Sequence, residues 1–162
     1  MSKIKQELEK PFEVKQLHWR VGATSNGKGI ALAYIDARDV MKRLDDVVGS
    51  FNWQSRYTHM TSTIAICEIG IQLVDEWVWK SDGAGDSNVE AEKGRISDAF
   101  KRTAVHWGIA RYLYKLPNVW VPLDQRKRLT MSNGLPVGVS LPVWATPEGY
   151  SKIMEKKNEP LV

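Results

Sequence analysis

Residues 93–117 read KGRISDAFKRTAVHWGIARYLYKLP, a stretch that predicts one long helix and decides the fold. Apolar or small residues recur along it in steps of three or four, the spacing of a helix face that packs against another layer. The predicted core stripe consists of Ile96, Phe100, Thr103, Trp107 and Ala110. An adjacent cationic pair, Lys101 and Arg102, interrupts this pattern near its middle. A helix with much to bury therefore carries two neighbouring charges that need an explanation.

Three strand-like segments precede this helix, at residues 52–60 (NWQSRYTHM), 62–73 (STIAICEIGIQL) and 76–83 (EWVWKSDG). The middle segment is apolar on both faces, as expected of a strand that is covered on both sides. Cys67 lies in it, where we expect a buried, unreactive thiol. The next residues, DGAGDSN at 82–88, are expected to end the sheet. We expect an α+β fold with a β-β-β-α core, in which an antiparallel sheet packs on the long helix.

The helix start and two shorter helices carry capping signals. We expect Ser87 or Asn88 to cap the long helix, with Glu90 and Glu92 in its first turn. A short N-terminal helix, KIKQELEK at residues 3–10, is expected to stop at Pro11. A third helix is expected within residues 34–51, with the Asp36 side chain as its cap and Gly49 at its end, burying a stripe of Val40, Leu44 and Val47.

A hairpin is predicted from two strand-like segments, QLHWRV at residues 16–21 and GIALAYI at residues 29–35. Asn26-Gly27 between them is a tight-turn signal, and we expect a long tip, GATSNGK at residues 22–28. The tip also matches the first seven positions of the phosphate-binding loop GxxxxGK[ST]. Gly29 replaces the hydroxyl residue, however, and a strand follows where that loop needs a helix. We therefore favour a flexible hairpin tip, in which Lys28 can touch a nucleic-acid backbone, over a P-loop nucleotide hydrolase.

The chain after Pro117 is richer in proline and glycine. We divide the chain into a core domain at residues 1–125 and a C-terminal appendage at residues 126–162. The appendage is expected to be partly irregular, packed by Trp120 and Trp144, with a short helix capped by Thr146 and with its last residues disordered.

Charge is unevenly distributed along the 162 residues, whose formal net charge is +4. Residues 61–90 contain six acidic residues and one basic residue, whereas residues 91–128 contain nine basic and three acidic ones. The basic block includes the long helix. A local excess of this kind suits a polyanion, although a solvated polar face is the ordinary explanation of a charge run.

The composition is that of one globular domain, since 43% of the residues are hydrophobic and seven are Trp. No apolar run approaches the roughly 18 residues that a membrane-spanning helix needs, and the N-terminus is too charged for a signal peptide. We expect a cytoplasmic protein that does not act at a membrane. Cys67 is the single cysteine, and the three His, at positions 18, 59 and 106, lack the spacing of a zinc site. We expect no metal and no cofactor.

The cationic pair belongs to a predicted ridge on the long helix. Lys93 and Lys101 align on one face, while Arg95 and Arg102 align on a neighbouring face about 100° around the axis. The ordinary alternative is an exposed face with intrahelical pairs such as Asp98 with Arg102, each contributing about 0.2–0.5 kcal/mol. A ridge of cations suits a nucleic acid better than a single phosphate ligand, because a backbone presents a row of anions and each contact releases counterions.

Three segments of the sequence together resemble a known family: YIDARDVMKRLDDVVGSFNW at 34–53, KSDGAG at 80–85 and VEAEKGRISDAFKRTAVHWGIARYLYKLPNVWV at 89–121. The likeness is to the phage and bacterial branch of the Rad-fifty-two superfamily of single-strand annealing proteins, of the Sak and DdrA types. It covers roughly residues 5–125, and the DAFKR...WGIARYLY part is its most specific.

The resemblance implies a β-β-β-α core that assembles side by side into rings or arcs, with single-stranded DNA in a basic groove. The positions that match the groove residues of that family are Lys93, Lys101, Arg102 and Arg38. One departure is Val105, where eukaryotic members have a further basic residue; His106 or Arg95 can partly compensate. We expect no counterpart of the C-terminal partner-binding region of eukaryotic members.

From residues and resemblance together we expect a non-catalytic protein that binds single-stranded DNA and promotes annealing of complementary strands in recombination and repair, without ATP. The expected DNA-binding residues are Lys101, Arg102, Lys93, Arg38, Arg95 and Lys28. Expected partners are further copies of the chain, and an exonuclease or single-strand binding protein of phage or host. The alternatives are a single-strand or DNA-end protecting binder that does not anneal, and the P-loop hydrolase.

Overall fold

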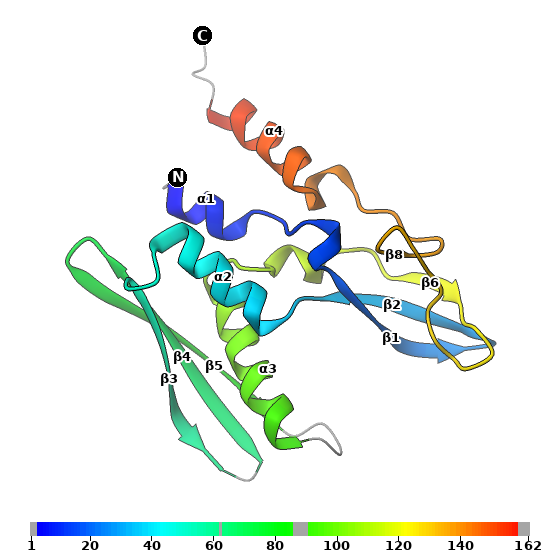
Figure 1. Cartoon of the computed structure of the whole chain (residues 1–162), viewed down its shortest axis with the longest axis horizontal. Helices are drawn as coiled ribbons and strands as arrows, with labels where there is room; N and C mark the ends of the chain where they lie inside the picture. Colours follow the sequence, from blue (N-terminus) through cyan, green and yellow to red (C-terminus); the bar gives the residue numbers. More distant parts are fainter. Residues whose placement is uncertain (1–2, 62, 86–90, 159–162) are drawn as a thin grey trace. The chain divides into compact units, whose positions relative to one another are not determined.

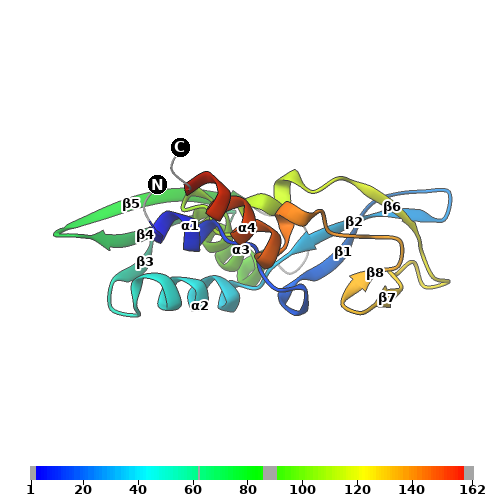
Figure 2. The same ribbon diagram turned by 90° about the horizontal axis from the view of Figure 1, so that it is seen from above.

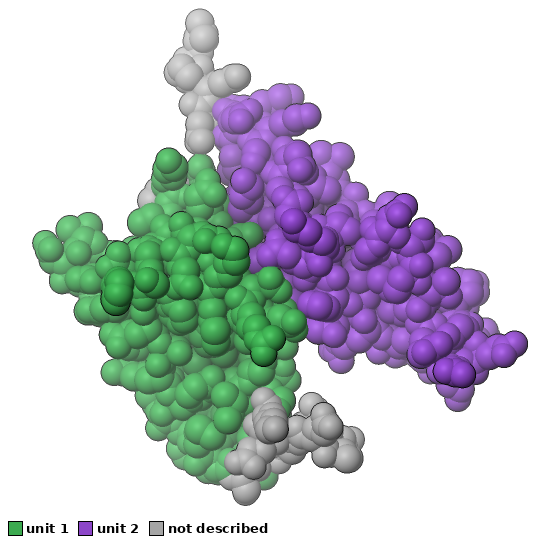
Figure 3. Space-filling view, viewed as in Figure 1, with its two compact units in different colours: residues 1–9, 36–111 green, residues 10–35, 112–162 purple. Residues whose placement is uncertain are grey.

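The computed structural model of the chain is shown in Figure 1. It describes residues 3–61, 63–85 and 91–158, of which the side chains of residues 91–93 and 158 are not described. The chain forms two compact units, coloured separately in Figure 3. Unit 1 contains residues 1–9 and 36–111, and unit 2 contains residues 10–35 and 112–162.

The predicted α+β class is confirmed, since helices and antiparallel sheets both contribute to the fold. The division into an annealing core at residues 1–125 and an appendage at residues 126–162 stays a prediction. Within the described parts of the chain, no helix is long and apolar enough to cross a membrane.

The sheet of unit 1 consists of three antiparallel strands in the order β3-β4-β5: β3 (Trp53–Met60), β4 (Ile64–Leu73) and β5 (Glu76–Gly85). All three predicted strands are present. β5 is longer than expected, because Ala84 and Gly85 still pair with Ala65 and Ile64 of β4. The glycines that suggested a break in the sheet therefore lie within its last ladder pairs.

The two faces of β4 differ, which corrects the expectation that both are covered. Ala65, Cys67, Ile69 and Ile71 are fully buried on one face. On the other face Gly70 is buried against the Trp79 ring, whereas Glu68 is half-buried and Gln72 is exposed. Alternate residues of a strand point to opposite faces, so the face of β4 that carries Cys67 and Ile69 is the one that α3 covers in the described part of the chain. The expected burial of the Cys67 thiol is confirmed.

Helix α3 (Ala91–His106) packs on β4 and β5, as Figures 1 and 2 show. Phe100 and Thr103 of the predicted stripe are buried, as is Trp107 just after the helix. The Thr103 hydroxyl donates to the Cys67 carbonyl at 3.0 Å, and the Trp107 indole N–H donates to the Ile69 carbonyl at 3.1 Å. Packing and hydrogen bonds together hold the helix at a defined place on the sheet.

The prediction that one helix continues through residue 117 is wrong, because α3 ends at His106. Gly108 follows with a φ of +95°, a conformation that suits glycine. The amide of Ile109 donates to the Ala104 carbonyl at 3.2 Å, and the amide of Gly108 donates to the Val105 carbonyl at 3.0 Å. This pair of bonds is the Schellman termination of a helix. A 3₁₀ turn, η2 (Arg111–Lys115), comes next.

Unit 1 also contains α1 (Lys3–Glu9) and α2 (Ala37–Val48), which pack on each other. The Arg43 guanidinium of α2 donates to the Glu7 carbonyl of α1 at 3.0 Å. Val40 and Leu44 are buried, as predicted. The Asp36 side chain makes no cap hydrogen bond, which corrects the predicted cap; its main-chain carbonyl instead accepts from Asp39 at 3.2 Å.

Unit 2 is built on the predicted hairpin, β1 (His18–Ser25) and β2 (Lys28–Tyr34), with β6 (Val119–Pro122) beside β2. Asn26 and Gly27 form a two-residue turn in which φ is positive at both positions, +48° and +74°. That is the type of turn whose twist matches the strands of a hairpin. The predicted long tip is therefore wrong, because residues 22–25 belong to β1 and Lys28 begins β2.

The remaining elements of unit 2 are η1 (Val14–Gln16), β7 (Met131–Ser132), β8 (Leu135–Pro136), η3 (Val143–Ala145) and α4 (Pro147–Asn158). The predicted cap of the last helix is confirmed, because the Gly149 amide donates to the Thr146 hydroxyl at 3.1 Å. Trp120 is 45% exposed, and the expectation that it packs the appendage stays a prediction.

Three sequence predictions fall outside the described residues. They concern the cap at Ser87 or Asn88, the Glu90 and Glu92 side chains in the first turn of the long helix, and the expected disorder of the last residues, 159–162.

Candidate nucleic-acid interface

Lys101 and Arg102 lie where the buried face of α3 meets its exposed face. Phe100 and Thr103, on either side of the pair, are buried. The Lys101 side chain is 27% exposed and lies 3.0 Å from the Asp98 carboxylate one turn earlier, whereas the Arg102 side chain is 52% exposed. The packed neighbours fix the backbone of the pair, so both charges project from a rigid base.

Arg102 is held by a carboxylate from the sheet. Asp82 of β5 contacts the Arg102 guanidinium at 3.2 Å through one oxygen and the His106 ring at 3.2 Å through the other. The Gly83 amide donates to Asp82 at 2.7 Å. Partial burial raises the pKa of Asp82, but the bonds from Gly83, His106 and Arg102 outweigh this effect and lower the pKa below the ordinary aspartate value.

The Asp82 contacts orient Arg102 and His106 together. A carboxylate that bonds two side chains limits the rotamers that either can adopt, so the guanidinium is aimed before any ligand arrives. The same carboxylate also competes with an incoming phosphate for those donors. Exposed ion pairs contribute only about 0–1 kcal/mol, so such a pair can exchange one anionic partner for another.

The predicted ridge of four cations is only partly present. Arg95 is 6% exposed, so it offers almost no surface to a ligand. Lys93 belongs to α3, but its side chain lies outside the described residues. Among the four ridge positions, the structure thus brings Lys101 and Arg102 to the surface, and the role of the other two stays a prediction.

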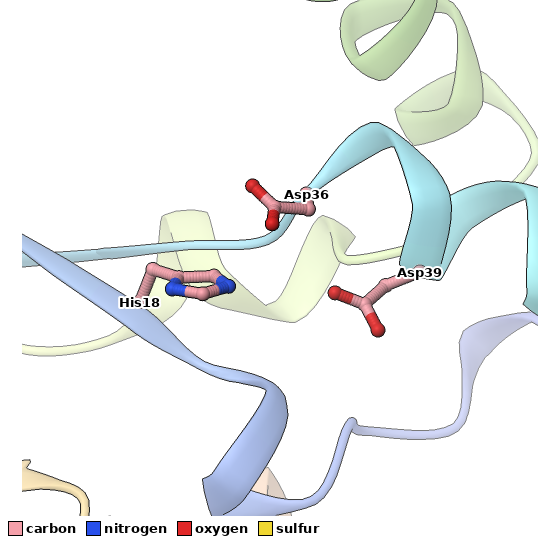
Figure 4. A group of neighbouring side chains, drawn as sticks. All are labelled: His18, Asp36 and Asp39. Carbon is pink, nitrogen blue, oxygen red and sulfur yellow. The ribbon is translucent and has the colours of Figure 1, made fainter.

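Arg38 lies in the first turn of α2 and is exposed. Helix α2 packs against α3 in unit 1. Figure 4 shows the neighbouring carboxylates, Asp36 and Asp39, at the start of α2. It also shows His18 at the start of β1. The His18 ring stacks on the Tyr34 ring with centroids 5.4 Å apart. The assignment of Arg38 to the groove stays a prediction.

Two other basic residues, Lys80 and Arg111, donate hydrogen bonds to main-chain carbonyls at the C-terminal end of α3. The Lys80 ammonium donates to the His106 carbonyl at 2.9 Å and lies 4.4 Å from the Trp107 ring centroid. The Arg111 guanidinium donates to the carbonyls of Val105 and His106, each at 2.8 Å. Cations at this end complement the helix dipole. Burial, followed by the charges of Arg111 and Lys5, lowers the pKa of Lys80.

Lys28 lies in unit 2, apart in the chain from the α3 pair. It is the first residue of β2, is exposed, and pairs across the ladders with Ser25 and Pro122. Residues 22–28 form two strand ends and a turn, not the loop and helix start that would cradle nucleotide phosphates. This geometry supports the hairpin interpretation of the GATSNGK segment.

An aromatic cluster on the sheet face opposite α3 was missed from the sequence, where most Trp were assigned to the core. Trp77 and Trp79 stack with centroids 6.1 Å apart, and the Arg56 guanidinium lies 3.9 Å from the Trp79 ring centroid. Arg56 also pairs with Glu68 at 2.6 Å. Trp77 is exposed. The only sequence signal was that both Trp occupy the same face of one strand.

A family model described as "Rad52/22 family double-strand break repair protein" matches residues 1–130. The chain belongs to the Rad52/22 family. The matched residues include all six predicted DNA-binding positions and the loop that follows β6. The resemblance inferred from the sequence is thereby confirmed.

Two bacterial relatives are each called "Single-stranded DNA-binding protein DdrA". The chain is 31% identical over 157 residues to the protein of Deinococcus deserti, covering 91% of this chain and 72% of the relative. It is 33% identical over 152 residues to the protein of Deinococcus radiodurans, covering 91% of this chain and 70% of the relative.

Proposed function

We propose that this protein binds single-stranded DNA and promotes the pairing of complementary strands during recombination and repair, without ATP, metal or covalent catalysis. The observation that carries the proposal is the pair of Lys101 and Arg102 on a packed helix, in a chain of the Rad52/22 family. The names of the DdrA relatives support DNA as the ligand.

The proposed mechanism separates holding the backbone from testing the bases. Lys101 and Arg102 exchange their carboxylate partners, Asp98 and Asp82, for phosphates of the strand. Phosphate contacts position a nucleic acid without reading its sequence. The base edges then stay available to a second strand, and base pairing itself supplies the specificity and the driving force.

Assembly into a ring or arc is part of the proposal. Within the described residues, β3 and β5 are the edge strands of their sheet, each paired on one side by β4. An edge strand presents main-chain donors and acceptors that a further strand can use. If edge strands of neighbouring copies paired, the sheet would continue from copy to copy. Lys101 and Arg102 would then recur at regular intervals along one DNA strand. Electron microscopy with and without single-stranded DNA tests this part of the proposal.

The test of function mixes two complementary labelled strands with the protein and follows both binding and pairing. We expect the wild-type protein to accelerate pairing without ATP. The double variant Lys101→Ala with Arg102→Ala should bind more weakly and lose most of the acceleration. Its slope of log affinity against log salt should flatten by up to about 1.4, at roughly 0.7 per lost contact.

The matched control is Lys156→Ala with Lys157→Ala, which removes the same charge from exposed positions of α4. We expect this control to keep the wild-type slope. Binding without faster pairing would favour the strand-protecting alternative, and ATP turnover abolished by Lys28→Ala would favour a hydrolase. An unchanged slope in a folded Lys101 and Arg102 variant would contradict the assignment of the pair.

A further inference from the structure

The loop that follows β6 in unit 2 is closed on itself and against the hairpin turn. The Leu123 amide donates to the Gly27 carbonyl at 3.0 Å, and Leu123 forms a β-bridge with Leu129. A Cβ added at Gly29 would lie 3.2 Å from the Leu123 side chain, which shows how closely this leucine packs on β2. The loop and the turn of the hairpin thus form one structure.

Asp124 organises the interior of this loop. Its carboxylate accepts the amides of Arg126 and Arg128, both at 2.8 Å, and the Arg128 guanidinium at 3.0 Å. Its own amide donates to the Arg128 carbonyl at 2.9 Å. The bond from the Arg128 amide is the largest effect on the pKa of Asp124; together with the bonds from the Arg128 side chain and the Arg126 amide it outweighs desolvation and lowers that pKa. The only carboxylate of the loop is therefore occupied inside it.

The remaining charges of this region are all positive and all exposed. We call them the basic tip: Lys28, Arg126, Lys127 and Arg128. Lys28 belongs to it because its ladder partner, Pro122, directly precedes the loop. Among the described residues, the side chains of Lys28, Arg126 and Lys127 have no carboxylate within ion-pair distance.

We propose that the basic tip binds the phosphodiester backbone of a nucleic acid, as a contact surface separate from Lys101 and Arg102. Several exposed cations on one closed loop match a row of phosphates better than a single small anion, and each contact releases counterions. Lys and Arg side chains reach phosphates without needing a base pocket. The choice of a nucleic acid as the ligand depends on the proposed function.

The test uses the full-length chain with Arg126→Ala and Lys127→Ala combined. The two side chains are exposed, and the Arg126 bond to Asp124 comes from the main-chain amide, which alanine keeps. The loop should therefore fold normally. Binding is measured across a salt series with a labelled oligodeoxythymidine strand and, separately, with a labelled duplex. Lys101→Ala with Arg102→Ala and the Lys156 and Lys157 control are measured in parallel.

We expect the tip variant to flatten the log-affinity against log-salt slope by up to about 1.4 for the single strand, or up to about 1.8 for the duplex. Whether the salt slope changes for the single strand or for the duplex identifies the form of DNA that the basic tip binds. Wild-type slopes in both arms would overturn the proposal, while a loss limited to the Lys101 and Arg102 variant would leave the proposed function standing. If the wild-type protein bound neither DNA, both proposals would fall.

Discussion

The α3 pair and the basic tip present positive charge in two different ways. Lys101 and Arg102 are each matched to a carboxylate of unit 1, Asp98 and Asp82. In the basic tip, by contrast, Asp124 is saturated by the loop, and Arg126 and Lys127 extend beyond it. A count of basic residues therefore does not measure the charge available to a ligand, because the fold decides which cations are already compensated.

The difference predicts different roles. A compensated pair on a packed helix is aimed in advance and binds by exchange, which favours a defined position of the strand. Cations without a carboxylate partner, such as Arg126 and Lys127, act at longer range, within a Debye length of about 8–10 Å at physiological salt. We therefore expect the basic tip to contribute to capture of the strand, and the α3 pair to its placement.

The largest change should come from loosening α3 from its sheet. Phe100→Ala removes a buried aromatic side chain and should lower the free energy of unfolding by about 3–5 kcal/mol. Urea denaturation measures this loss. Phe51→Ala is the control, since Phe51 is 94% exposed and its removal should change stability by no more than about 0.5 kcal/mol. Equal effects of the two substitutions would mean that packing does not hold α3.

The next largest effect concerns the independence of the two basic surfaces. Combining the four alanine substitutions at Lys101, Arg102, Arg126 and Lys127 should flatten the single-strand salt slope by up to about 2.8, the sum of four contacts at roughly 0.7 each. Additivity is expected because the surfaces share no side chain. A combined effect no larger than that of either double variant would show that both act on the same contact.

A smaller effect is expected from removing the carboxylate that competes for Arg102. Asp82→Ala should tighten single-strand binding by up to about fivefold at low salt, since an exposed ion pair is worth at most about 1 kcal/mol. A fluorescence titration gives the Kd. Asp46→Ala is the matched control, because it releases Lys42 on α2 from a similar 2.9 Å pair. Weaker binding by Asp82→Ala would mean that Asp82 is needed chiefly to aim the guanidinium.

The smallest effect should appear in the pH dependence of stability. The pKa of Asp82 is lower in the folded protein than its ordinary value of about 3.9. The ionised carboxylate therefore adds to the free energy of unfolding above that pH, and this contribution is lost as the pH falls through the folded pKa. The unfolding free energies of the wild type and Asp82→Asn should differ at pH 6 and converge in acid. If the difference in unfolding free energy between the two proteins stayed constant down to the lowest pH, titration of Asp82 would not contribute to stability.

The sequence predicted the local parts of the fold well. The three strands of unit 1, the buried Cys67 and the Thr146 cap depend on alternation and short-range signals. The α3 pair was found for the same reason, because adjacent cations beside an apolar stripe are visible in one segment. The end of α3 was missed although its signal, a glycine two residues after His106, was present.

What the sequence could not predict depends on distant partners. The burial of Arg95 and the pairing of Arg102 with Asp82, 20 residues earlier in the chain, are set by the packing of α3 on β5. The cluster of Arg56 with Trp79 requires the register of three strands. The basic tip joins the turn at Gly27 to a loop almost a hundred residues later, which no periodicity reveals.

The glycine that terminates α3 also fixes the direction in which the pair points. A Cβ at Gly108 would lie 2.5 Å from the Glu9 side chain, which shows how closely the residue that follows α3 approaches α1. Each residue turns a helix by about 100°, so the number of residues between Arg102 and Gly108 sets the direction in which both cations point from the helix axis. Extra turns at the N-terminal end of α3 would leave this direction unchanged. One residue inserted after Arg102 would rotate both cations about the helix axis by more than a quarter of a circle.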